Sequence, residues 1–151
     1  MTTKGEEMNI TEFLEARIAE DELMARNASP GPWSFSDIES IGGGTIYDPT
    51  VAIAHVEWDT EHVDSRIRRT RPREQADATG SHIARHNPAR VLAECAAKRV
   101  ILGTYMAVAA NKNVEGSVQW YEEKALRTSV DTLATVYKDH PDYQQEWTLE
   151  A

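Results

Sequence analysis

The chain has 151 residues, of which 40% are hydrophobic and 27% are charged, and its formal net charge is −9. This composition is typical of a globular protein, and the length suits one domain. No apolar run reaches the roughly 18 residues that a membrane-spanning helix needs, so we expect no membrane partner. The negative charge also argues against general affinity for nucleic acid, because nucleic-acid-binding domains are usually basic.

The single cysteine, Cys95, excludes an internal disulfide. The first twelve residues lack the apolar segment of a secretory signal. We therefore expect a cytoplasmic protein, located in the host cytoplasm if a phage encodes it. We also expect residues 1–10 to form a flexible N-terminus and residues 11–151 to form a single α+β domain.

The first predicted element is a helix that starts at Asn9 or Thr11 and ends near Arg26. Asn9 and Glu12 have the spacing of a capping box, in which each residue satisfies a backbone N–H of the other. Two prolines and a glycine at 30–32 cannot continue a helix. The predicted apolar stripe of this helix consists of Phe13, Leu14, Ile18, Leu23 and Met24.

Alternating residues from Trp33 to Glu57 predict a three-stranded antiparallel meander. The expected turns lie at 42–44, which are three glycines, and at 48–50. On the third strand we expect Val51, Ile53 and His55 on one face, and Ala52, Ala54 and Val56 on the other. So small a sheet needs a helix on one face to be stable. A loop is expected over residues 58–72.

The stretch from His82 to Leu92 predicts a corner between two helices. Asn87 is a favourable N-cap residue and Pro88 suits the first helical position, so one helix should end near His86 where the next begins. The preceding helix starts at Arg73 or Ser81. The next is expected from Pro88 to about Ala110, and a last long helix from about Val114 to Lys138.

His82 and His86 are four residues apart, so both imidazoles share one helix face and can reach a single metal ion such as zinc. A zinc site needs at least one further protein ligand. The candidates are Asp77, His55, His62, Glu94, Cys95 and His140, and none has diagnostic spacing. The alternative is that the two rings are structural or merely solvated.

Near the C-terminus, Asp139 and Asp142 flank His140, and a carboxylate can orient and charge an imidazole. The same segment also has a structural explanation. Pro141 ends a helix, and Tyr143 and Trp147 can anchor the tail.

Residues 66–99 carry nine arginines and lysines against three acids, about +6, which leaves −15 for the rest of the chain. Guanidinium groups recognise phosphate and carboxylate in a bidentate manner. The segment therefore predicts a binding surface for a nucleotide, nucleic acid or acidic protein. Alternatively, it pairs with acidic residues of its own chain or of a second copy. The candidate binding residues are Arg66, Arg68, Arg69, Arg71, Arg73, Arg85, Arg90 and Trp58.

Three motifs, at residues 30–33 (PGPW), 82–92 (HIARHNPARVL) and 139–147 (DHPDYQQEW), carry a resemblance over nearly the whole chain. They resemble a family of small actinobacterial and phage proteins known only as domain of unknown function 6221. The resemblance implies an accessory protein without established activity. Many relatives carry cysteines that suggest a metal knuckle, but here the interval from Gly103 to Lys138 has none.

The predicted fold class is α+β: an N-terminal helix, a small three-stranded antiparallel meander, then a helix–helix corner and two longer helices. We expect an accessory protein that acts by macromolecular binding, to a host protein or to itself as a homo-oligomer, without a cofactor and without assigned catalytic residues. One alternative is a metal-dependent hydrolase or nuclease that uses His82 and His86. The other is nucleotide or nucleic-acid binding through the patch from Arg66 to Arg73.

Overall fold

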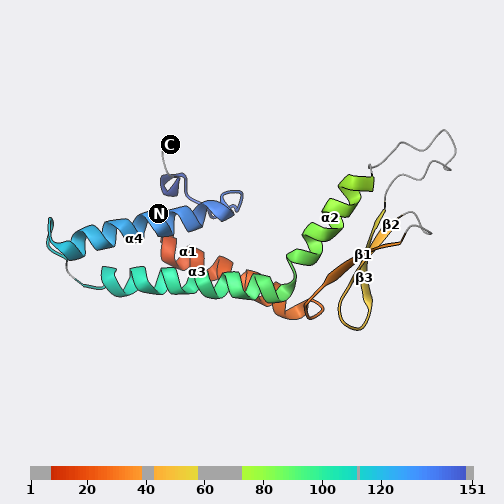
Figure 1. Cartoon of the computed structure of the whole chain (residues 1–151). Coiled ribbons are helices and arrows are strands. Elements are labelled where there is room, and N and C mark those ends of the chain that lie inside the picture. The colour runs from red at the N-terminus through yellow and green to blue at the C-terminus, as the bar shows by residue number, and fades with distance from the viewer. Residues whose placement is uncertain (1–7, 39–42, 58–72, 112, 149–151) are drawn as a thin grey trace, which may run out of the picture. The chain divides into compact units, whose positions relative to one another are not determined.

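The computed structural model describes residues 8–38, 43–57, 73–111 and 113–148 (Figure 1). Helix α1 and three antiparallel strands are followed by helices α2, α3 and α4, which confirms the predicted α+β class. Two 3-10 turns, η2 and η3, follow α4. The elements are α1 (Ile10–Asn27), β1 (Ser34–Ile38), β2 (Gly43–Tyr47), β3 (Ala52–Glu57), α2 (Arg73–Arg85), α3 (Pro88–Ala109), α4 (Val118–Ala134), η2 (Thr135–Tyr137) and η3 (Gln145–Trp147).

The chain divides into two compact units. Residues 1–22 and 94–151 form one, here called the helical unit, and residues 23–93 form the other, here called the sheet unit. Helices α1 and α3 each contribute residues to both units. The single domain expected over residues 11–151 stays a prediction, and residues 1–7 lie outside the described part of the chain.

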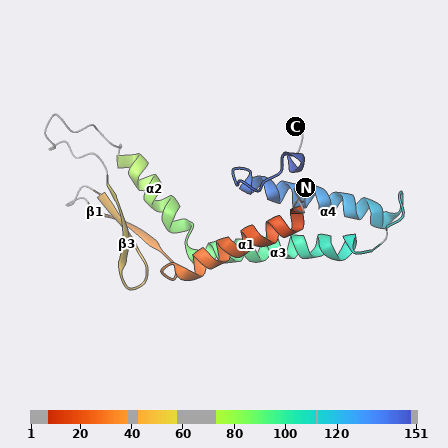
Figure 2. The ribbon, with the colours of Figure 1, turned by 180° about the vertical axis from the view of Figure 1, so that it is seen from behind.

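In the sheet unit, the strands lie in the order β1-β2-β3, and helix α2 lies along one face of this sheet (Figures 1 and 2). The sheet thus has the covering helix that its small size requires. The buried residues Ile46 and Val56 from the sheet meet Ala76 and Ala84 from α2. Small alanines on α2 bring the helix close to the sheet.

The Phe35 ring occupies the space beside two glycines, Gly44 on β2 and Gly80 on α2. A Cβ atom at either glycine would collide with this ring. The expected glycine turn at 42–44 is therefore wrong for Gly43 and Gly44, which lie inside β2 and are buried. Both positions lack side chains because neighbouring side chains fill that space, Phe35 at Gly44 and His55 at Gly43.

Strand β3 departs from the expected alternation. The register pairs Ile46 with Ala54 but Tyr47 with Ala52, so Ile53 is the extra residue of a β-bulge. The bulge lets Ile53 pack against the cluster that also contains Val56, whereas the sequence pattern placed these two residues on opposite faces.

The turn between β2 and β3 is an Asx turn. The Asp48 carboxylate accepts hydrogen bonds from the backbone N–H groups of Thr50 (2.7 Å) and Val51 (2.8 Å), and from the Thr50 hydroxyl (2.8 Å). These bonds favour the charged carboxylate and lower the pKa of Asp48. The expected turn at residues 48–50 is confirmed.

In the helical unit, α1 begins with the predicted capping box. Asn9 Oδ1 accepts from Glu12 N–H at 3.0 Å, and Glu12 Oε2 accepts from Asn9 N–H at 3.0 Å. The fully buried Phe13 then forms the centre of an aromatic cluster, with its ring 4.9 Å from Trp147 and 6.1 Å from Tyr143. Farther along α1, Leu23 and Met24 are exposed, so the predicted apolar stripe is wrong at these two positions.

Polar contacts join α1 to α3 and to the segment after α4. The Tyr137 hydroxyl donates to Asp21 at 2.6 Å, and Lys98 donates to the Tyr137 oxygen at 2.8 Å. Burial and the bond to Asp21 raise the pKa of Tyr137. Arg99 makes a two-pronged contact with Glu22, at 2.8 and 3.1 Å. These bonds hold the helices of this unit in register.

Helix α4 starts four residues later than expected. The Ser117 side chain is its N-cap and accepts a hydrogen bond from the Trp120 N–H, and the preceding Gly116 adopts a φ of +81°, outside the helical range. The side chains of Val118 and Tyr121 are exposed in its first two turns. Among the helices that the structure describes, none has the length and apolar character needed to cross a bilayer.

The two helical glycines, Gly80 and Gly103, should respond oppositely to alanine. Gly80→Ala forces a Cβ into the Phe35 ring, and we expect a loss of about 1–3 kcal/mol in the free energy of unfolding. Gly103→Ala meets nothing within 4 Å and should gain about 0.5–1 kcal/mol from helix propensity. Urea titrations of both variants measure this difference, and equal effects would contradict the packing described for Phe35.

Candidate functional site

The predicted corner between two helices is present, and the side chain of Asn87 forms it. Its Oδ1 accepts from the backbone N–H groups of Ala89 (3.1 Å) and Arg90 (3.4 Å) at the start of α3. Its Nδ2 donates to the carbonyl of Ala84 (3.2 Å) in the last turn of α2. One amide therefore satisfies exposed backbone groups at the end of one helix and at the start of the next.

A depression of about 320 Å³ lies at this corner. Residues from both helices surround it, and we call it the basic corner. The side chains of His82, Arg85, His86 and Arg90 are exposed. Among the described residues that line the corner, none is acidic. The lining residues are Ala78, Ser81, His82, Arg85, His86 and Arg90.

The two predicted imidazoles lie together, with ring centroids 4.2 Å apart and ring planes inclined by 40°. His86 Nδ1 lies 2.9 Å from the carbonyl oxygen of His82. A carbonyl can only accept, so His86 Nδ1 is the protonated nitrogen of the neutral ring. The remaining nitrogen, Nε2, is then the one free to meet a ligand.

These two imidazoles lack further metal ligands in the part of the chain that the structure describes, where no three His, Cys, Asp or Glu side chains gather as a metal group. Of the other candidates, His55 contacts Thr45, and Asp77 lies 3.9 Å from Arg73. Burial raises the pKa of the Cys95 thiol, which disfavours the metal-binding thiolate. His62 lies outside the described residues.

The predicted arginine surface is only partly described. Arg66, Arg68, Arg69, Arg71 and Trp58 lie outside the described residues.

Among the described candidate arginines, Arg85 and Arg90 line one depression, whereas Arg73 lies apart from them. Arg73 is the first residue of α2, twelve residues or about 18 Å along the helix from Arg85. Its guanidinium contacts Asp37 at 2.5 Å. The structure therefore joins Arg85 and Arg90 to the histidine pair and separates Arg73 from them.

The segment around His140 has a structural role. His140 Nδ1 accepts from the backbone N–H of Asp142 at 3.1 Å, and the ring packs edge-on against Phe13 at 5.7 Å. The guanidinium of the buried Arg17 contacts the same ring. These contacts support the structural explanation of this segment, with Trp147 as its buried anchor.

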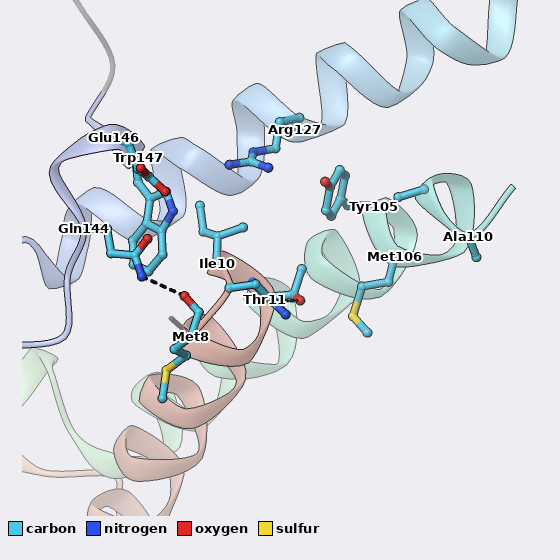
Figure 3. Close-up of a pocket in the computed structure, with 12 residues that line it drawn as sticks. Met8, Ile10, Thr11, Tyr105, Met106, Ala110, Arg127, Gln144, Glu146 and Trp147 are labelled. Carbon is cyan, nitrogen blue, oxygen red and sulfur yellow. Dashed lines mark hydrogen bonds between the residues drawn. The ribbon is translucent and has the colours of Figure 1, made fainter. Parts of the chain in front are cut away.

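A second depression, of about 570 Å³, lies in the helical unit (Figure 3). It is lined by the start of α1, the second half of α3, α4 and the tail, including Ile10, Met106 and Trp147. The Gln144 amide donates to the Met8 carbonyl at 2.8 Å across one side. Sequence reasoning missed this groove, because its walls come from four segments far apart in the chain.

A further surface of the helical unit is formed by the second half of α3. Residues 100–109, VILGTYMAVA, contain no charged side chain. Five of them are exposed, and we call these the uncharged face: Val100, Gly103, Thr104, Met106 and Ala107. The most apolar of them, Val100, is 69% exposed. The absence of charge is visible in the sequence, but its exposure is not.

The fold and these surfaces define a small α+β protein with a helix-covered sheet and a helical unit. A family model described as a family of unknown function (DUF6221) matches residues 7–149, and the chain belongs to this family. No curated protein and no solved structure matches the chain.

The hydrogen bond between His86 Nδ1 and the His82 carbonyl predicts which nitrogen of the His86 ring carries the proton. At a pH where the ring is neutral, long-range ¹H–¹⁵N spectra should show His86 protonated at Nδ1, because this nitrogen donates to the His82 carbonyl. A His86→Gln variant assigns the signal. Protonation at Nε2 in the wild-type protein would contradict the described geometry of the corner.

Proposed function

We propose that this is an accessory protein of phage or actinobacterial origin that acts by binding protein, and that its first partner is a second copy of itself. The supporting observation is the uncharged face, an exposed surface of α3 in an otherwise acidic unit. The proposal extends the family resemblance, which implies no activity. A helix that is apolar on all sides is normally buried, so this part of α3 calls for a covering partner.

Charge favours this face over the rest of the helical unit for contact between two copies. Residues 1–22 and 94–151 contain sixteen Asp and Glu against eight Lys and Arg, a net charge of −8. Two such units repel one another wherever acidic residues meet. Residues 100–109 contribute none of this charge, so two copies can approach there without repulsion.

Burying the uncharged face would also leave few polar groups without partners. The Thr104 hydroxyl donates to the Val100 carbonyl at 2.8 Å and needs no water. Gly103 has no side chain, and nothing lies within 4 Å of where a Cβ would stand, so a second backbone can approach closely. Contact there would gain apolar burial at little desolvation cost.

The uncharged face is small, so we expect a weak dimer. Ten residues at 1.5 Å each extend about 15 Å along the helix. A stable interface buries about 800 Å² on each partner, which is more than one stretch of this length supplies. We therefore expect a dimer in fast exchange that dissociates on dilution.

Replacing Val100 tests the proposal. The wild-type mass by sedimentation equilibrium should rise from the 16.9 kDa monomer towards twice that value as the concentration increases. Val100→Glu places a charge in the face and should weaken association about tenfold or more, because an unpaired charge must be buried. The free energy of unfolding should change little at this exposed position.

Val118→Glu is the matched control, since Val118 is 78% exposed on α4 of the same unit. It adds the same charge outside the uncharged face and should leave association unchanged. A wild-type protein that stays monomeric at millimolar concentration would overturn self-association. Equal weakening by the two variants would show that net charge governs the contact, and would overturn the role of this face.

A further inference from the structure

We propose that the basic corner is a binding site for the phosphoryl group of a small phosphorylated ligand. The site consists of Ser81, His82 and Arg85 from α2, His86 directly after this helix, and Arg90 from the start of α3. This inference is independent of self-association, because the corner lies in the sheet unit and the uncharged face lies in the helical unit.

The lining offers the donors that a tetrahedral oxyanion needs. Two guanidinium forks can each give a bidentate contact, and Ser81 adds a hydroxyl. Both arginines are positively charged, and a phosphate monoester carries a charge of about −1.5 to −2. Arg85 belongs to α2 and Arg90 to α3, and the corner between the two helices places both at one depression.

The same charges decide between an anion and a metal cation. Arg85 and Arg90 keep their positive charge at any physiological pH, and no carboxylate stands among the described residues that line the corner. A divalent cation bound by the imidazoles would be repelled by the two guanidinium groups that line the same depression. The corner thus offers a metal ion only the two imidazoles, whereas it offers an anion the donors of Arg85, Arg90 and Ser81.

The volume and the polar lining of the depression restrict the class of ligand that it can bind. About 320 Å³ is near the lower limit of small-molecule sites, which span about 300–1,000 Å³. Charged and polar side chains dominate the lining, so the depression suits a phosphoryl group and not an apolar ring. The organic part of the ligand would extend outside. The acidic chain, at −9, disfavours a long polyanion such as nucleic acid.

Sulfate is the appropriate first probe, because it is a tetrahedral oxyanion like a phosphoryl group. Ring signals of His82 and His86 are followed by NMR during titration with sodium sulfate at constant ionic strength. Saturable shifts of both signals are expected. Shifts that grow linearly without saturation, or that are equal with sodium chloride, would overturn the site.

A double variant, Arg85→Gln with Arg90→Gln, should weaken sulfate binding about tenfold or more, because it removes both guanidinium forks. The matched control is Lys124→Gln with Lys138→Gln, which removes the same charge from exposed positions of the helical unit. The control should bind as the wild type does. Equal binding by the arginine variant, with its dispersed amide spectrum intact, would contradict the proposal.

Three further titrations identify the source of the anion. Adenosine monophosphate should bind more tightly than sulfate and compete with it. A single-stranded oligonucleotide that binds more tightly than the monophosphate would overturn the small-ligand assignment in favour of nucleic acid. Zinc chloride that shifts both imidazoles and displaces sulfate would overturn the anion site. Val100→Glu should bind sulfate normally, so failure of this site and failure of self-association are distinguishable.

Discussion

The arrangement around the basic corner depends on the side-chain amide of Asn87. It accepts from two N–H groups of α3 and donates to a carbonyl of α2, so the chain stops one helix and starts another within two residues. Gly31 leaves the space for this amide, since a Cβ there would lie 2.7 Å from Asn87 Oδ1. The motifs at residues 30–33 and 82–92 therefore meet at one contact. The change of direction places Arg90 beside His82 and Arg85.

The two units offer different chemistry to partners. The sheet unit has nine acids and eight basic residues over 23–93, so its net charge is −1, and it presents arginines and imidazoles at the corner. The helical unit is strongly acidic, yet one face of α3 has no charge. The two proposals therefore assign protein contact to the uncharged face and anion binding to the basic corner.

Local signals in the sequence were sufficient for much of this fold. The capping box at Asn9, the Asn87–Pro88 corner and the meander follow from interactions between near neighbours in the chain. The wrong predictions concern positions whose structure depends on contacts with distant segments of the chain. Gly44 lies in a strand and leaves space there for the Phe35 ring, and Ile53 joins the core through a bulge. The sequence did not identify the uncharged face, because periodicity cannot show which side of a helix lacks a neighbour. At the site, helical spacing brought His82 and His86 together correctly, but only the fold joins them to Arg90 and separates them from Arg73.

The most direct measurement is the sulfate titration of an Asn87→Ala variant, which keeps every charge of the corner and removes only the amide. Loss of the cap should make the amides of Ala89 and Arg90 exchange faster, at a cost of about 1 kcal/mol in stability. Sulfate affinity should then fall although His82, Arg85, His86 and Arg90 are all present, because α2 and α3 no longer hold them around one depression. Unchanged affinity in a folded variant with faster amide exchange would contradict the account, since the charges alone would then suffice.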